Sequence, residues 1–132
     1  MRFLFYFLKQ IVECMKKTDK KYDKAIREAL SDACNIALEE VPGFSWLTHQ
    51  LNYSRFPQSL VVTAVFDTEA ALSAAIRGQQ DDYLRSVIKQ HLASVGIVMR
   101  HAKRTIHFDS EEACQQAHSG NWQRRLSAKQ AH

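Results

Sequence analysis

The fold is decided by the stretch Phe66-Asp67-Thr68-Glu69-Ala70-Ala71, which recurs 42 positions later as Phe108-Asp109-Ser110-Glu111-Glu112-Ala113. Each copy follows a run of strand-forming residues and precedes a run with helical periodicity. Asp, Thr and Ser commonly cap helix N-termini, and Glu in the first turn suits the positive end of the helix dipole. The repeat therefore predicts one unit written twice: two short strands, the Phe-Asp-(Thr/Ser)-Glu phrase, and a helix.

The rest of the chain fits around these two units. Apolar residues at three- and four-residue steps from Tyr22 to Ala37 predict a helix that ends at Val41-Pro42-Gly43. Strands are predicted at residues 44–53, 60–66, 95–99 and 105–108. We therefore expect an α+β fold of order α-β-β-α-(α)-β-β-α. An antiparallel sheet of about four strands would carry its helices on one face.

The length of 132 residues fits a single domain. We expect this domain to span residues 15–126, followed by a tail at 127–132. Residues 1–14 are interpreted as an N-terminal extension from a start site assigned too early, because Met15-Lys16-Lys17 resembles a natural start. The alternative is an amphipathic helix that docks on the domain through Phe3, Phe7 and Ile11.

Composition narrows the class of protein. The three cysteines are widely spaced and odd in number, so we expect no disulfide framework and a cytoplasmic location. The N-terminal apolar run is too short to span a bilayer, and we expect no membrane span. Phosphate-binding glycine loops are absent, so no cofactor is predicted. Cys114 and His118 share a helix face, but a structural zinc site needs four ligands, and we predict no metal.

The acidic residues of the repeat suggest one enzymatic alternative. Asp67, Asp109 and Glu112 could hold Mg²⁺ or Mn²⁺ and support phosphodiester hydrolysis, provided that the two acidic turns converge. The same residue types are those that cap helices, which is the interpretation we favour. The sequence thus predicts that an enzyme is the less favoured class, with a metal-dependent phosphodiesterase as the alternative.

A basic surface is the strongest binding feature. The net charge is +4, and residues 97–132 hold six basic and three acidic side chains. A hairpin tip at residues 100–104 and the C-terminal tail concentrate this charge, and basic side chains there can neutralise phosphates. We therefore predict a binding or regulatory module with nucleic acid as its leading partner. The predicted contact residues are Arg100, Lys103, Arg104, Arg124 and Arg125.

A second binding hypothesis concerns Trp46. Strand alternation places this side chain on the face opposite Leu47, so helices on one face would leave it exposed. Exposed large aromatic side chains favour protein interfaces. The alternative function is therefore a protein-interaction module or a homodimer that uses Trp46 and sheet-edge surface, unless a terminal segment covers the Trp46 side chain.

Several stretches also resemble a small uncharacterised bacterial family, some members of which are labelled Fis-type transcription regulators. They are residues 41–49, 56–60, 65–68 and 108–113. The resemblance covers roughly residues 15–126. Fis-type proteins are all-helical, whereas this chain has four strand-like runs, so the resemblance implies the extent of the domain and no site residue.

Overall fold

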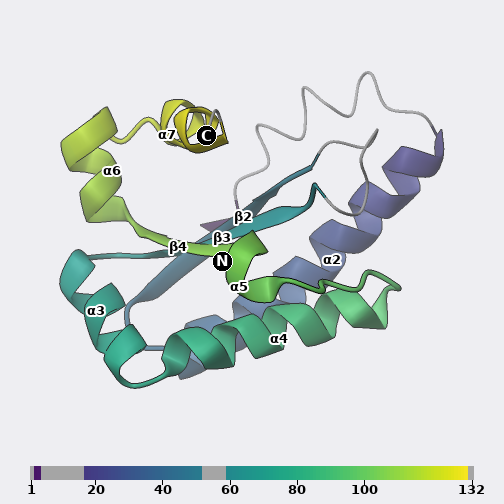
Figure 1. Ribbon diagram of the computed structural model, residues 1–132, viewed down its shortest axis with the longest axis horizontal. Coiled ribbons are helices and arrows are strands. Elements are labelled where there is room, and N and C mark those ends of the chain that lie inside the picture. The colour runs from purple at the N-terminus through teal and green to yellow at the C-terminus, as the bar shows by residue number, and fades with distance from the viewer. Residues whose placement is uncertain (1, 4–16, 52–58, 131–132) are drawn as a thin grey trace.

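The computed structural model describes residues 2–3, 17–51 and 59–130. The chain begins with the two-residue strand β1 (Arg2–Phe3), the long helix α2 (Lys17–Glu40), and strands β2 (Phe44–Gln50) and β3 (Val61–Phe66). Helices α3 (Glu69–Arg77) and α4 (Gln80–Ser94) follow. The short helix α5 (Ala102–Thr105), strand β4 (Ile106–Ser110), and helices α6 (Glu111–His118) and α7 (Trp122–Gln130) complete the chain. The α+β class is confirmed (Figure 1).

The sheet is mixed rather than antiparallel. Its strand order is β1-β2-β3-β4. Strands β2 and β3 form the predicted antiparallel hairpin, but β4 lies parallel to β3, with Val62 opposite Ile106 and Phe66 opposite Ser110. Helices α3 and α4 form the crossover that a parallel connection requires. Strand β1 is also parallel to its neighbour β2. The predicted antiparallel sheet is therefore wrong.

The prediction of a second ββα unit is also wrong, because residues 95–99 do not form a strand. They end helix α4 instead. The Ile97 amide donates to the Leu92 carbonyl and the Gly96 amide to that of Ala93, with Gly96 at φ +87°. This pattern is the Schellman motif, in which a glycine in the left-handed region closes a helix. Arg100–Arg104 is accordingly no hairpin tip, and most of it forms helix α5.

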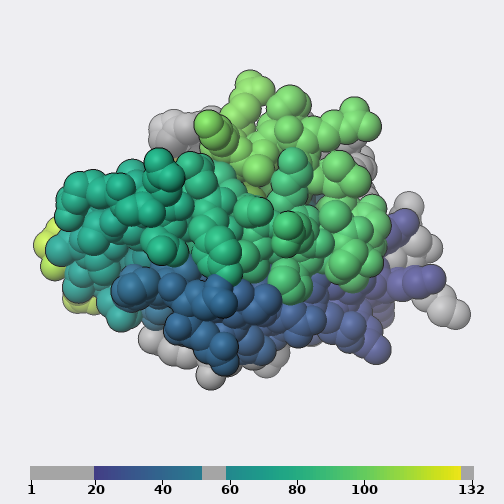
Figure 2. All heavy atoms as spheres, turned by 90° about the horizontal axis from the view of Figure 1, so that it is seen from below, coloured from purple at the N-terminus to yellow at the C-terminus, as the bar shows by residue number. Residues whose placement is uncertain are grey.

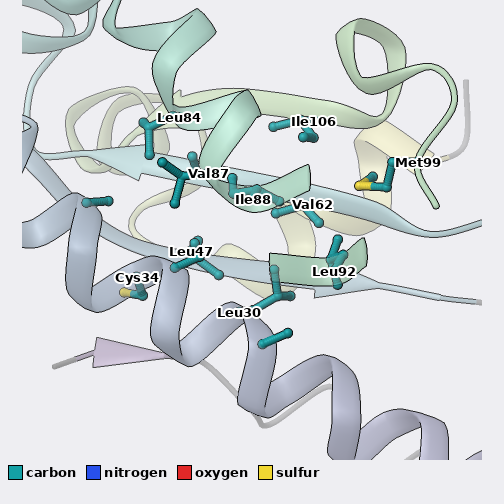
Figure 3. Close-up of a cluster of buried hydrophobic side chains, with 14 of the residues drawn as sticks. Leu30, Cys34, Leu47, Val62, Leu84, Val87, Ile88, Leu92, Met99 and Ile106 are labelled. Carbon is teal, nitrogen blue, oxygen red and sulfur yellow. The ribbon is translucent and has the colours of Figure 1, made fainter. Parts of the chain in front are cut away.

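Helices cover both faces of the sheet, not one (Figure 1). On one face, α2 and α4 pack on the strands and lie side by side (Figure 2). Figure 3 shows Leu30 and Cys34 from α2 and Leu84 and Ile88 from α4 meeting the sheet side chains in this main core. On the other face, a smaller core is built from α6, α7 and two neighbouring strand residues. Its buried residues are Trp46, Val65, Cys114, Trp122 and Leu126.

The described residues cover the predicted C-terminal boundary, but only part of the predicted N-terminal extension. Helix α7 continues to Gln130, across the boundary predicted at residue 126. Of the predicted extension at residues 1–14, only Arg2 and Phe3 are described, paired with Trp46 and Leu47 of β2. Helix α2 has 24 residues, but neither it nor any other described helix combines the length and hydrophobicity that a bilayer-spanning segment needs.

Gly43 positions strand β2 against the first copy of the repeat. It has φ +82°, and its carbonyl accepts a hydrogen bond from the Asp67 amide at 2.9 Å. A Cβ atom on Gly43 would lie 2.5 Å from the Cβ of Ala71, in helix α3. The turn therefore requires glycine both for its dihedral angle and for the close approach of α3.

We predict that Gly43→Ala lowers the free energy of unfolding by about 3 kcal/mol. A left-handed alanine costs about 1–2 kcal/mol, and forcing a methyl group into packed structure costs about 1–3 kcal/mol more. Gly96→Ala is the matched control, because Gly96 has φ +87° but a Cβ atom there meets nothing within 4 Å. Urea denaturation of both variants measures the difference, and equal losses would contradict the close approach of Ala71.

His49 is a buried histidine of strand β2, on the same strand face as Leu47. Burial and the nearby charge of Arg27 lower the pKa of His49 from 6.5 to about 4. The imidazole is therefore neutral in the folded protein at pH values where it is protonated in the unfolded chain. The unfolded chain binds the extra proton, so stability falls as the pH drops from about 6.5 towards 4.

We predict that this histidine contributes a loss of about 2 kcal/mol in the free energy of unfolding between pH 7 and pH 5. Denaturant titrations at both pH values measure it. His49→Leu should show a smaller loss than the parent protein over this interval. The same pH dependence in both proteins would contradict a neutral, buried His49.

Candidate functional site

The two copies of the repeat lie side by side. Because β3 and β4 are parallel, both end at the same edge of the sheet, and helices α3 and α6 both begin there. The Thr68 hydroxyl accepts from the Ala71 amide at 3.0 Å, and the Ser110 hydroxyl accepts from the Ala113 amide at 3.0 Å. Both copies thus cap their own helices as the sequence predicts.

The copies also hydrogen-bond to each other. The Glu69 amide donates to the Glu112 carboxylate at 2.9 Å, and the Ser110 hydroxyl donates to the Glu69 carboxylate at 3.1 Å. The Glu112 amide donates to the Asp67 carbonyl at 3.3 Å. We name residues 67–69 and 109–112 the paired joint. Its convergence is the geometry that the enzymatic alternative required, but two of its carboxylates accept hydrogen bonds from the opposite copy.

Asp109 is held by an ion pair inside the protein. Its carboxylate accepts two hydrogen bonds from the Arg125 guanidinium, at 2.7 and 2.9 Å. The Asp109 side chain is 3% exposed and that of Arg125 is 12% exposed. The hydrogen bond to Asp109 raises the pKa of Arg125. This arrangement opposes two predictions: a catalytic Asp109 open to a metal ion and an Arg125 free to contact phosphate.

Arg125 also joins α7 to α6. It donates to the Ala113 carbonyl at 3.4 Å and to Nδ1 of His118 at 3.3 Å. Cys114 is buried beside this network, and burial raises the pKa of its thiol. Within the part of the chain that the structure describes, no group of three or more His, Cys, Asp or Glu residues is arranged to hold a metal ion. The hydrogen bonds of the paired joint thus connect parts of the protein to one another.

Trp46 is fully buried, which corrects its predicted place on the surface. Its ring meets that of Trp122 edge to face, with centroids 4.9 Å apart. One Glu111 carboxylate oxygen accepts from the indole nitrogens of both Trp46 and Trp122, at 2.6 and 3.0 Å. Helix α7 therefore covers the face that the sequence left open, and Trp46 does not form an exposed interface.

The remaining basic residues separate into two groups. Arg100, Lys103 and Arg104 are all exposed, in and just before helix α5, and we name residues 100–104 the basic segment. Arg124 is exposed on α7, which packs on the face of the sheet opposite α4. The two basic features that the sequence predicted as nucleic-acid contacts, at residues 100–104 and in the tail, thus belong to different layers of the fold.

Backbone hydrogen bonds fix the shape of the basic segment. The His101 carbonyl accepts from the Arg104 and Thr105 amides at 2.9 and 3.0 Å, and from the Thr105 hydroxyl at 2.9 Å. The ring of His107 donates to the Arg104 carbonyl at 2.8 Å. These bonds use no charged group, so the three cationic side chains stay available to solvent.

A pocket of about 470 Å³ opens beside the basic segment. Leu60 and Met99 are buried, whereas Val98 is 61% exposed. Sequence reasoning missed this pocket, and the adjacency of an apolar run and a basic run at residues 97–104 was the signal that could have indicated it. Its described lining residues are Leu60, Gly96, Val98, Met99, Arg100, His101 and Thr105.

We predict that Asp109→Asn lowers the free energy of unfolding by about 3 kcal/mol, because it leaves the guanidinium of Arg125 buried without its counter-charge. Asp82→Asn is the matched control. Asp82 pairs with Arg85 at 3.0 Å but is 63% exposed, and breaking an exposed pair costs less than about 1 kcal/mol. Chemical denaturation separates the two variants, and a loss for Asp109→Asn as small as that of the control would contradict the buried pair.

Comparison with known proteins adds no further identification. No family model, no curated protein and no solved structure matches this chain. The resemblance to a small bacterial family stays a prediction.

Proposed function

We propose that this protein is a non-enzymatic binding module that contacts the phosphate backbone of nucleic acid through its basic segment. One observation carries the proposal. Arg100, Lys103 and Arg104 are exposed within a 26-residue stretch, residues 83–108, that contains no Asp or Glu. Three cations close together in a stretch without acidic residues contribute a positive potential that attracts polyanions.

The ion pairs made by arginines elsewhere in the chain support the basic segment as the phosphate-binding site. In the described residues, ion pairs hold Arg27, Arg85 and Arg125 to aspartates, and none holds a residue of the basic segment. A carboxylate offsets the charge of a paired arginine and uses part of its N–H donors, whereas an exposed, unpaired arginine exchanges only water and counterions when it binds phosphate. The basic segment is therefore better suited to phosphate contact than the arginine-rich start of α7.

The alternatives have less support. The carboxylates of Glu69 and Glu112 accept hydrogen bonds within the paired joint, and that of Asp109 is paired with Arg125. These contacts favour a binding module over a hydrolase. The protein-interaction hypothesis used an exposed Trp46 together with sheet-edge surface, and the Trp46 side chain is buried against Trp122.

We predict that replacing Arg100, Lys103 and Arg104 together by alanine weakens nucleic-acid binding and flattens its salt dependence. Each lost phosphate contact should reduce the slope of log Kobs against log salt by about 1 for duplex DNA and by slightly less for a single strand. Fluorescence anisotropy with a labelled oligonucleotide at several salt concentrations measures both quantities.

The matched control replaces Lys20, Lys21 and Lys24 by alanine. These side chains are exposed on α2, and the variant loses the same three charges at another site. It should keep most of the parent affinity. Equal losses in the two triple variants would indicate a general charge effect and contradict a site at the basic segment, as would binding by the parent protein that does not change with salt.

A further inference from the structure

The pocket beside the basic segment combines two surface chemistries. Leu60, Val98 and Met99 provide apolar wall, and Arg100, His101 and Thr105 provide polar and cationic groups. A ligand that fits both must carry an apolar, compact part attached to an anionic one. Ligand pockets commonly enclose about 300–1,000 Å³, so the volume of about 470 Å³ is ample for one nucleotide unit.

Val98 is the unusual residue of this pocket. It is one of five large hydrophobic side chains exposed in the described part of the chain, and the one with the greatest exposure, at 61%. The other four lie on α2, α3 and α4, and none of them is among the described lining residues of the pocket. Val98 lines the pocket and is exposed to solvent, two positions from Arg100 and three from His101, so it offers apolar contact to a bound group.

We infer that this pocket, which we name the Val98 pocket, takes an unpaired base of a single-stranded nucleic acid whose flanking phosphates lie on the basic segment. The inference rests on the proposed function and adds a substrate class to it. Bases in a duplex are stacked inside the helix, whereas bases of single strands and loops can turn outward into protein pockets. The pocket therefore selects single strands over duplexes.

A lipid surface is the main competing anionic ligand, and the geometry disfavours it. Membrane-binding surfaces present a broad apolar face flanked by cations. Among the described lining residues, Val98 is the one apolar side chain that is well exposed, and Leu60 and Met99 are 2% and 5% exposed. A concave site of this kind suits one inserted group better than a flat acyl layer.

The test compares three fluorescent probes of equal length in anisotropy titrations: a single-stranded oligonucleotide, its duplex, and an abasic strand that keeps the phosphates without bases. Because base contacts contribute substantially to single-strand affinity, the parent protein should bind the base-bearing strand about 10-fold more tightly than the abasic one. Val98→Asn should lose most of that preference and leave abasic binding unchanged.

Ile76→Asn is the matched control, because Ile76 is 49% exposed on α3 and away from the pocket. It should keep the base preference. A second readout needs no variant: the chain has three methionines, and ¹³C-methyl labelling lets the Met99 resonance report on the pocket. The base-bearing strand should shift this resonance and the abasic strand should not.

The outcomes separate the two proposals. Equal affinity of the parent protein for all three probes, or an equal loss of preference in Val98→Asn and Ile76→Asn, would overturn the pocket inference and leave phosphate binding standing. Absence of binding to every probe would overturn both. Displacement of the oligonucleotide by phosphatidylglycerol vesicles, with a Met99 shift caused by the vesicles alone, would overturn the inference in favour of a lipid.

Discussion

The parallel pairing of β3 with β4 is the constraint on which the rest of the structure depends. It carries the carboxyl ends of both strands to one edge of the sheet and starts α3 and α6 beside each other. Helix N-termini leave amide groups without intrahelical partners, and here each copy of the repeat supplies acceptors to the other as well as to itself. A sequence repeat of six residues therefore becomes a reciprocal hydrogen-bonded joint, with the Glu69 and Glu112 carboxylates as its links.

The contacts of this joint determine which charged side chains remain available to bind a ligand. Within it, the Glu111 carboxylate also accepts hydrogen bonds from both indole nitrogens and Asp109 pairs with Arg125, so that α6 and α7 close over Trp46. Most of the acidic side chains of the repeat are thereby used in structure. The paired joint and helix α5 lie at opposite ends of strand β4. The joint is at the carboxyl end of this strand, and α5 immediately precedes its amino end. The exposed basic side chains and the Val98 pocket lie at that second end, where no acidic residue is present between positions 83 and 108.

The features that follow from local sequence could be predicted. The long first helix, the first hairpin and the hydroxyl caps at Thr68 and Ser110 all depend on residues within a few positions of each other. The second hairpin could not, because residues 95–99 have the composition of a strand while Gly96 closes a helix. Contacts between residues far apart in the sequence could not be predicted either. Arg125 meets Asp109 from 16 positions away, and Glu111 meets Trp46 from 65 positions away. The charge and exposure of Arg100, Lys103 and Arg104 were predictable. The pocket was not, because it forms only where Leu60 lies beside residues 96–105 in the fold.

The direction of β4 relative to β3 tests this account most directly, and nuclear Overhauser contacts between backbone protons of the two strands measure it. We expect contacts that advance in the same direction along both strands, from Val62 near Ile106 to Phe66 near Ser110. Contacts that place Val62 near Ser110 and Phe66 near Ile106 would show an antiparallel pair. That result would separate the two copies of the repeat and contradict the paired joint.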